Sequence, residues 1–553
     1  AQVSSLTVPY VAITPALVQM LVQRLEEARR KDWVYKLYNS YLTLMVWAMQ
    51  REAQAAEPMR YLARLELPNI RRGLAFLLDN GWMDTGLEYA KLLEHHLRHL
   101  GFYSEVDALG ARTRAATVKA LSSEQPLERG AVRFLFTITE QLAVSGRLPE
   151  ALALLTKLRE RWQTDNKEQK GGLSYKGYDA VVDLASTLRR LGGYKLTMGQ
   201  EAPAIEHYTE AIKALRSLVP NDSLRQELVE LYNNLGEAQL AALDLSKAEE
   251  AYQEGLKLAV ELKNERAVGL MYTRLGTVAT VRNDNAQARQ LLEEALAHLA
   301  IVEDYISMAT TWSQLATLAL RLSDTAEAVR CYENALQVAE KAKQPGIQAQ
   351  LCVRLARLAE QAGQNDEARA RYEQAIHFYA EQNIPLALAS TQMDLASLLL
   401  REGKAKQAKV HAEKARPIIE KVGAEAKPWE VHSLLERIAK VEGDAEKEAL
   451  WHARAQESFA ESPEAKKTLE HWQGIIDRIA GACRGEALDN KLVELLESLE
   501  STPQWRELVE AVWRVLGGER GAELYAELEP MPALLVREIL RAIESPAEAA
   551  SGE

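Results

Sequence analysis

One leucine returns at a fixed spacing of 40 residues through the middle of this 553-residue chain. A constant period of this length is typical of stacked helical units, each of which buries its apolar face only against its neighbours. Such a chain forms an extended array rather than one central core. The six leucines are Leu235, Leu275, Leu315, Leu355, Leu395 and Leu435.

Other side chains repeat together with the leucine. A large residue precedes it by three positions and a small one follows it directly. An alanine comes 13 positions later in the first five repeats, a tyrosine 17 later in three of the six, and a small residue 20 later in all of them. Two helices approach closely only where glycine or alanine lies at the crossing, so this pattern predicts antiparallel helix pairs. In the first repeat these residues are Tyr232, Gly236, Ala248, Tyr252 and Gly255.

The offsets resemble those of the tetratricopeptide repeat family, in a variant with 40 residues per unit instead of about 34. The resemblance implies an all-α fold, namely a right-handed α-solenoid of stacked antiparallel helix pairs. Six extra residues, shared between two helices, lengthen each helix by roughly one turn. Ser246 with Glu249, and Asp324 with Glu327, are expected to form capping boxes at the starts of second helices.

The pattern divides the chain into four segments. The regular array of six 40-residue repeats occupies 228–460, and less regular helix pairs occupy 131–227. Residues 1–130 are expected to form a helical entry or linker, with at most a short strand in 1–14. Residues 461–553 are expected to form a helical cap that ends in a disordered tail, because a solenoid needs a polar-faced end.

Residues 65–105 resemble the entry to the repeat array in bacterial STAND-type signalling ATPases. The resemblance rests on a glutamate, an asparagine and an amphipathic helix, here Glu66, Asn69 and the helix around Leu74. It implies the C-terminal sensor region of a larger protein. Because the chain opens at Ala1 without a methionine, we expect it to be an excised piece of such a protein.

Composition argues against several classes of partner. The formal charge of −12 disfavours a nucleic-acid surface, since phosphate binding needs a basic face. The most apolar stretch, Leu42 to Met49, is far shorter than the ~20 residues of a membrane span. Cys331, Cys352 and Cys483 have neither metal-site nor disulfide spacing, which favours a reducing cytoplasm. We expect a cytoplasmic protein that binds neither nucleic acid nor membrane.

No catalytic motif is present in the sequence. There is no glycine loop ending in Gly-Lys-Ser/Thr and no His-Glu-x-x-His run. His95 and His99 are one helical turn apart, a spacing that can hold a metal, but no nearby carboxylate or cysteine completes a site. Partly exposed helix histidines are therefore the favoured interpretation. The prediction is a protein that is not an enzyme and has no cofactor and no metal.

The remaining candidate is a binding surface. The resemblance implies that the first helix of each pair lines a concave groove, in which a protein or peptide ligand binds. Carried over by register, the candidate partner-binding residues include three arginines, which suit an acidic or carbonyl-rich partner. The candidates are Asn233, Arg274, Gln314, Arg354 and Arg357.

The leading functional hypothesis is a non-catalytic sensor or scaffold module of a larger bacterial signalling or immune protein. One alternative is the regulatory arm of an enzyme, either a caspase-like protease or a STAND ATPase, or of a transcription regulator. Another is a scaffold for homo-oligomerisation. The flanking gene sequence would distinguish the leading hypothesis from the regulatory-arm alternative. A phosphate-loop module upstream would favour the former, and a protease dyad downstream would favour the latter.

Overall fold

The computed structural model describes residues 27–49, 56–80, 82–99, 102–122, 126–165, 176–488, 490–502 and 505–544. Every regular element in these ranges is a helix, which confirms the predicted all-α fold of stacked helix pairs. The short strand expected in 1–14 and the tail expected after residue 544 lie outside the described residues. The chain divides into two compact units, Ala1–Ala288 and Arg289–Glu553.

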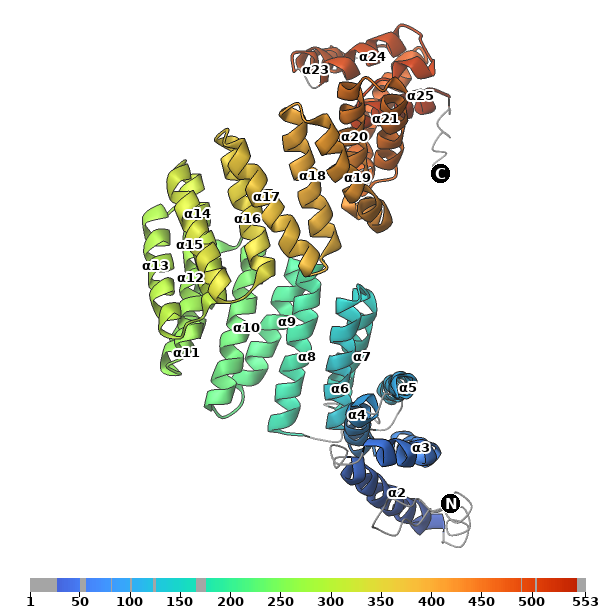
Figure 1. Ribbon diagram of the computed structural model, residues 1–553, viewed down its shortest axis with the longest axis vertical. Coiled ribbons are helices and arrows are strands. Elements are labelled where there is room, and N and C mark those ends of the chain that lie inside the picture. The colour runs from blue at the N-terminus through green and yellow to red at the C-terminus, as the bar shows by residue number, and fades with distance from the viewer. Residues whose placement is uncertain are drawn as a thin grey trace. The chain divides into compact units, whose positions relative to one another are not determined.

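In the first unit, successive helices pack against each other in chain order (Figure 1). The pairs α8·α9 and α10·α11 make extensive contacts, and α9 also contacts α10. Its helices are α2 (Glu27–Met49), α3 (Ala56–Asp79), α4 (Met83–His99), α5 (Tyr103–Leu121), α6 (Arg129–Val144), α7 (Leu148–Asp165), α8 (Tyr178–Thr197), α9 (Glu201–Arg216), α10 (Asp222–Ala241), α11 (Leu245–Glu261) and α12 (Glu265–Val281), followed by the start of α13 (Asn285–Ile301).

The second unit continues the same alternation and then departs from it. Its paired helices are α14 (Tyr305–Arg321), α15 (Thr325–Lys341), α16 (Pro345–Gln361), α17 (Asn365–Glu381), α18 (Pro385–Arg401), α19 (Ala405–Val422), α20 (Pro428–Glu442) and α21 (Ala445–Ala460), with the short η2 (Ala424–Ala426) before α20. After them come α22 (Pro463–Cys483), α23 (Asn490–Glu500), α24 (Arg506–Leu516), η4 (Ala522–Leu524) and α25 (Pro530–Glu544).

Helices of constant length explain the 40-residue period. From α11 to α18 each helix has 17 residues and is followed by a three-residue turn. The middle residue of each turn is left-handed, for example Lys343 with φ 52° and Gly363 with φ 75°. The next residue closes the turn: the Asp324 N–H donates to the Ala319 carbonyl at 2.9 Å. Two helices with their turns therefore occupy 40 residues.

The same turn fixes the position of each helix cap. Asp324 caps α15 as predicted, with its Oδ1 accepting from the Glu327 N–H at 2.9 Å. The Glu327 carboxylate bonds to Arg330 instead of returning to the cap. The predicted cap at Ser246 is wrong: Asp244 caps α11, accepting from the Lys247 N–H at 3.3 Å. A three-residue turn requires the cap directly after its left-handed residue, which places the cap of α11 at position 244.

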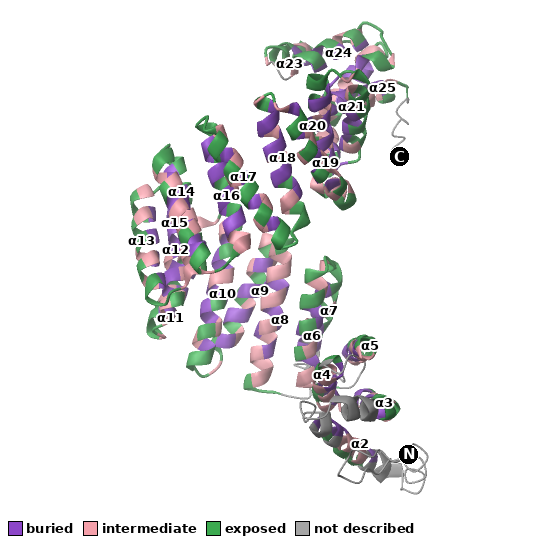
Figure 2. Cartoon of the chain, in the orientation of Figure 1, coloured by how far each residue is buried: buried purple, intermediate pink, exposed green. Residues whose placement is uncertain are grey.

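The repeated leucines are buried as their register predicts. Leu235 is the most exposed of the six, at 8%, and Leu395 is fully buried. The repeated alanines, including Ala248 and Ala328, have no exposed surface. Buried and exposed residues alternate along each helix of the array, as expected for helices with one packed face (Figure 2). The helices of a pair approach closely at Gly236, where an added Cβ would lie 2.5 Å from the Tyr252 ring.

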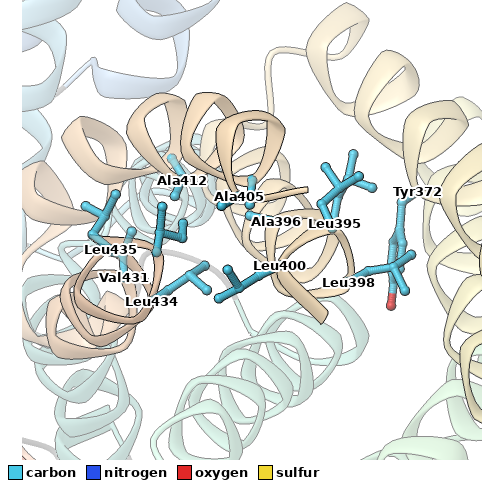
Figure 3. Packing of buried hydrophobic residues seen from close by; sticks show 14 of the residues in the cluster. Tyr372, Leu395, Ala396, Leu398, Leu400, Ala405, Ala412, Val431, Leu434 and Leu435 are labelled. Atoms are coloured by element: carbon cyan, nitrogen blue, oxygen red, sulfur yellow. The ribbon is translucent and has the colours of Figure 1, made fainter. Parts of the chain in front are cut away.

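A cluster in the second unit shows how neighbouring repeats share one core. Leu395 and Ala396 of α18, Ala412 of α19, and Leu434 and Leu435 of α20 belong to a single set of contacting buried residues (Figure 3). Each repeat therefore completes its burial with side chains of the next one, which is why a single isolated repeat has no stable core.

The helices after the array have a separate core. Leu492 and Leu496 of α23, and Leu508, Val512 and Val515 of α24, are buried together. α25 packs against both α21 and α22. These helices thus cover the last helix pair of the array. Among the described helices, none has the length and apolar character needed to cross a membrane.

Candidate functional site

In the first unit, two predicted partner-binding residues lie on neighbouring first helices and contact each other. The Arg274 Nε donates to Asn233 Oδ1 at 3.1 Å, and Arg274 Nη2 lies 3.8 Å from Glu237 Oε2. Both Asn233 and Arg274 are half-buried. The pair therefore ties α10 to α12, and a partner would have to compete for this guanidinium. Partner contact at these residues stays a prediction.

In the second unit, the other predicted residues also have internal contacts. Gln314 is half-buried on α14. The guanidinium of Arg354 lies 5.8 Å from the centre of the Tyr332 ring, and its Nη1 donates to the Tyr332 hydroxyl at 3.4 Å. Arg357 Nη2 donates to Asp394 Oδ2 at 2.9 Å, and this hydrogen bond raises the pKa of Arg357. The arginines are thus less free to recruit an acidic partner than the sequence suggested.

A cavity of about 660 Å³ lies at the C-terminal end of the same first-helix face. Helices α18 and α20, which contact each other directly, form one wall. The start of α25 and Trp505 form the other wall. In Figure 1 these elements gather at the C-terminal end of the second unit, where α25 packs against α21. The cavity therefore lies where the repeats meet the covering helices.

The array side of the cavity follows the repeat register. Two of its residues on α18 occupy the positions of predicted candidates in earlier repeats: Met393 lies four repeats beyond Asn233, and Ser397 lies one repeat beyond Arg357. The next repeat supplies the equivalent positions on α20. This wall thus continues the positions at which the sequence predicts partner contact, and contact at them stays a prediction. The residues are Met393, Asp394 and Ser397 on α18, and Ser433, Leu434 and Arg437 on α20.

Aromatic and sulfur-containing side chains make the cavity largely apolar. The Trp429 ring meets the Phe459 ring edge-on, with centroids 5.4 Å apart. Met531 packs in the same cluster, and Trp505 lies against Trp472 at 5.3 Å. Concave apolar surfaces of this kind, with a few polar groups, bind ligand side chains. The cavity volume falls within the roughly 300–1,000 Å³ of known ligand pockets.

Charged groups surround this apolar surface. Asp394, Glu430, Glu529 and Arg437 line the cavity. Asp394 accepts from Arg357, and Glu430 lies 3.7 Å from Lys427. Within the part of the chain that the structure describes, Glu529 and Arg437 have no ion-pair partner. The cavity therefore offers both a free carboxylate and a free guanidinium to a ligand.

Sequence reasoning missed the second wall. Pro530, Met531, Pro532 and Trp505 lie outside the 40-residue repeats, so the repeat register assigns them no position. The sequence carries one signal for this wall, a Pro-Met-Pro run followed directly by an amphipathic helix. Nothing in the repeat pattern says where a non-repeating segment docks, so only the structure places it against α20.

A second cavity, of about 610 Å³, lies between α21 and α25. Its polar groups satisfy each other: Gln456 Nε2 donates to the Leu528 carbonyl at 2.7 Å, and Arg537 Nη2 donates to Gln456 Oε1 at 2.9 Å. His452 Nδ1 lies 2.8 Å from Glu436 Oε1. This network ties α25 to the array and is a structural feature of the cap.

The residues that suggested metal or nucleophile chemistry are placed in structural positions. Burial raises the pKa of both Cys331 and Cys352 to about 11, which keeps both thiols protonated at neutral pH. The rings of His95 and His96 meet edge-on, with centroids 5.2 Å apart, and the side chain of His99 is outside the described residues. In the described ranges, no group of three or more His, Cys, Asp or Glu residues is placed to hold a metal ion.

Comparison with known proteins identifies the repeats. The family model of the tetratricopeptide repeat matches residues 307–381, which span α14 to α17, so the chain contains tetratricopeptide repeats. A search of curated protein sequences found no match.

Similar solved structures include BtubC from P. vanneervenii, with 20% identity, a TM-score of 0.35, and coverage of 43% of this chain and 92% of that one. Aspartyl phosphate phosphatase F from Bacillus subtilis has 12% identity and a TM-score of 0.39, covering 70% and 93%. Pseudomonas aeruginosa pilF has 17% identity and a TM-score of 0.32, covering 45% and 99%. At these identities the similarity concerns the fold alone.

Proposed function

We propose that this chain is a non-catalytic module that binds a protein or peptide through the first-helix face of its repeat array. The single observation that carries the proposal is the aromatic cavity at the C-terminal end of that face, lined by α18, α20 and the start of α25. A regular array of helices supplies a rigid surface, and a pre-formed cavity reduces the entropy lost when a ligand docks.

The proposal that the module is non-catalytic rests on the chemistry of its side chains. A cysteine nucleophile needs a lowered pKa and access to solvent, whereas Cys331 and Cys352 are buried and have raised pKa values. The cavity itself is lined by carboxylates, serines and one arginine beside apolar groups, without a histidine or cysteine among its lining residues. This set suits recognition of a ligand more than its chemical conversion.

At a finer level, we propose that the module acts as the sensor or scaffold of a larger bacterial signalling or immune protein. The support is the resemblance of residues 65–105, now seen as the end of α3, α4 and the start of α5, to the entry of STAND-type repeat arrays. Sequencing the complete parent gene tests this context. An upstream phosphate-loop module is expected, and a downstream protease dyad would make the array the regulatory arm of an enzyme.

The binding function itself is tested by selection. A phage-displayed library of random peptides is panned against the full chain, and enriched peptides are measured by titration calorimetry. Sequence-specific enrichment is expected, with affinity lost in Ser433→Trp, which fills the cavity from α20. Failure of any peptide to enrich would reject peptide binding as the function.

Two variants locate the selected peptides. The first is a triple variant, in which alanine replaces Arg274, Arg354 and Arg357, and it reports on the earlier repeats. The second, Ser433→Trp, reports on the cavity. A peptide whose affinity neither variant alters binds outside the first-helix face, which contradicts the proposal. Circular dichroism of each variant verifies that its helical content matches that of the unmodified chain.

A further inference from the structure

The charges that face the cavity are unequal. Three carboxylates, those of Asp394, Glu430 and Glu529, line it against the single guanidinium of Arg437. The cations that partner two of these carboxylates, Arg357 and Lys427, are not among the lining residues. Among the described residues, a ligand inside the cavity therefore meets one lining carboxylate without an ion-pair partner, Glu529, and one such guanidinium, Arg437.

The start of α25, beside the cavity, adds little attraction for an anionic ligand. A helix N-terminus normally attracts anions through its free N–H groups. At the start of α25, however, Pro530 and Pro532 have no N–H, and the carboxylate of Glu529 stands directly before them. The N-terminus of α25 thus presents few donors and already has an anionic neighbour, so an acidic ligand gains little there.

The apolar surface defines the other half of the ligand. Trp429 and Phe459, arranged edge-on, together with Met393 and Met531, provide contact area for one bulky apolar side chain. Trp429 also interacts with cations, since the Lys427 ammonium lies 5.9 Å from its ring centre. The Glu529 carboxylate at the cavity wall is free to pair with a basic group of a ligand.

Taking the proposed binding function as given, we propose that the occupant of this cavity is a peptide segment in which a bulky apolar side chain adjoins lysine or arginine. The apolar side chain enters between α20 and the start of α25, against Trp429. The adjoining cation pairs with Glu529, and the Arg437 guanidinium donates to a peptide carbonyl. This ligand chemistry is opposite to the acidic partner that the arginines of the earlier repeats suggested.

Four synthetic peptides test the proposal on the full chain by fluorescence anisotropy. The first is acetyl-Gly-Ser-Lys-Trp-Lys-Ser-Gly-amide with a fluorescein label. The second replaces Trp with Ala, the third replaces both Lys with Glu, and the fourth keeps the composition but separates Trp from both Lys. The first is expected to bind at least about tenfold more tightly than each of the others, a difference of about 1.4 kcal/mol.

A matched pair of glutamates locates the charge contact. Glu529→Gln is expected to weaken the first peptide about threefold to tenfold without affecting the glutamate peptide. Glu527→Gln, two residues away and lining the second cavity instead, is expected to change nothing. Ser433→Trp is expected to abolish binding of the first peptide, with circular dichroism verifying the fold.

Two outcomes separate the failure of this inference from that of the binding function. If the glutamate peptide binds as tightly as the lysine peptide, or if Glu529→Gln and Glu527→Gln behave alike, the ligand class is wrong. Sequence-specific acidic peptides from the phage selection would overturn the ligand class and leave the binding function standing. The absence of any specific peptide would overturn both.

Discussion

Replacing Gly236 with alanine should destabilise the first unit by crowding the contact between α10 and α11. The added Cβ would lie 2.5 Å from Cε1, 2.7 Å from Cζ and 2.8 Å from Cδ1 of Tyr252. Tyr252 has no exposed surface, so its ring cannot move into solvent to avoid the new Cβ. The helices must separate instead, and overpacking of this kind costs about 1–3 kcal/mol.

An opposing effect sets the net magnitude. Alanine in the middle of a helix is favoured over glycine by roughly 0.5–1 kcal/mol. We therefore expect Gly236→Ala to destabilise by about 1–2 kcal/mol overall. Gly193→Ala in α8 is the control, because its Cβ would have only the Tyr208 hydroxyl nearby, at 3.6 Å. That change should stabilise by about 0.5–1 kcal/mol.

A second substitution tests the same contact. Leu292 occupies in its own repeat the position that Tyr252 holds here. A leucine at 252 removes the ring atoms that oppose the new Cβ, so Tyr252→Leu combined with Gly236→Ala should be less destabilising than the sum of the single changes. The expected coupling is about 1 kcal/mol or more, within the range for residues in contact.

Urea unfolding followed by far-ultraviolet circular dichroism gives the stability differences, and hydrogen exchange of α10 and α11 gives the local effect. Both are needed because repeat arrays open in parts. Equal stabilisation by Gly236→Ala and Gly193→Ala, or strictly additive behaviour of the double variant, would refute the close approach of Gly236 to Tyr252.

Four other outcomes follow from the packing and the pKa directions. Leu315→Ala should lower the free energy of unfolding by about 2–5 kcal/mol in urea titrations, since this leucine is buried; a loss under about 1 kcal/mol contradicts the register. Lys343→Gly should raise the free energy of unfolding, measured by thermal melting, by up to about 1 kcal/mol, because glycine adopts the left-handed φ of 52° without strain. Gly363→Ala should lower it. Burial lowers the pKa of His207, so the unfolded state takes up its proton first and stability falls as pH drops below about 6.5; His207→Gln should reduce this loss in pH-dependent melting, and an unchanged pH profile contradicts it. Cys352 should react with iodoacetamide at neutral pH only as fast as the protein unfolds, and rapid labelling of the folded chain contradicts its burial.

The helical array was predictable from the sequence because its contacts are local. Each repeat buries its leucine and alanines against the adjoining repeat, so the residues that form the core are separated by a fixed, short distance along the chain. Leu395, Ala396 and Ala412 could thus be assigned to the core from their spacing alone.

The tertiary structure alone decided how that face is used. Whether Arg274 or Arg357 is free depends on side chains one repeat away, Asn233 and Asp394, whose orientation the period does not determine. The cavity itself requires Met393, Trp429 and Met531 to come together. Met531 belongs to a segment without any repeat, and its docking depends on how the surfaces of α21, α22 and α25 fit, which is a property of the folded chain rather than of spacing.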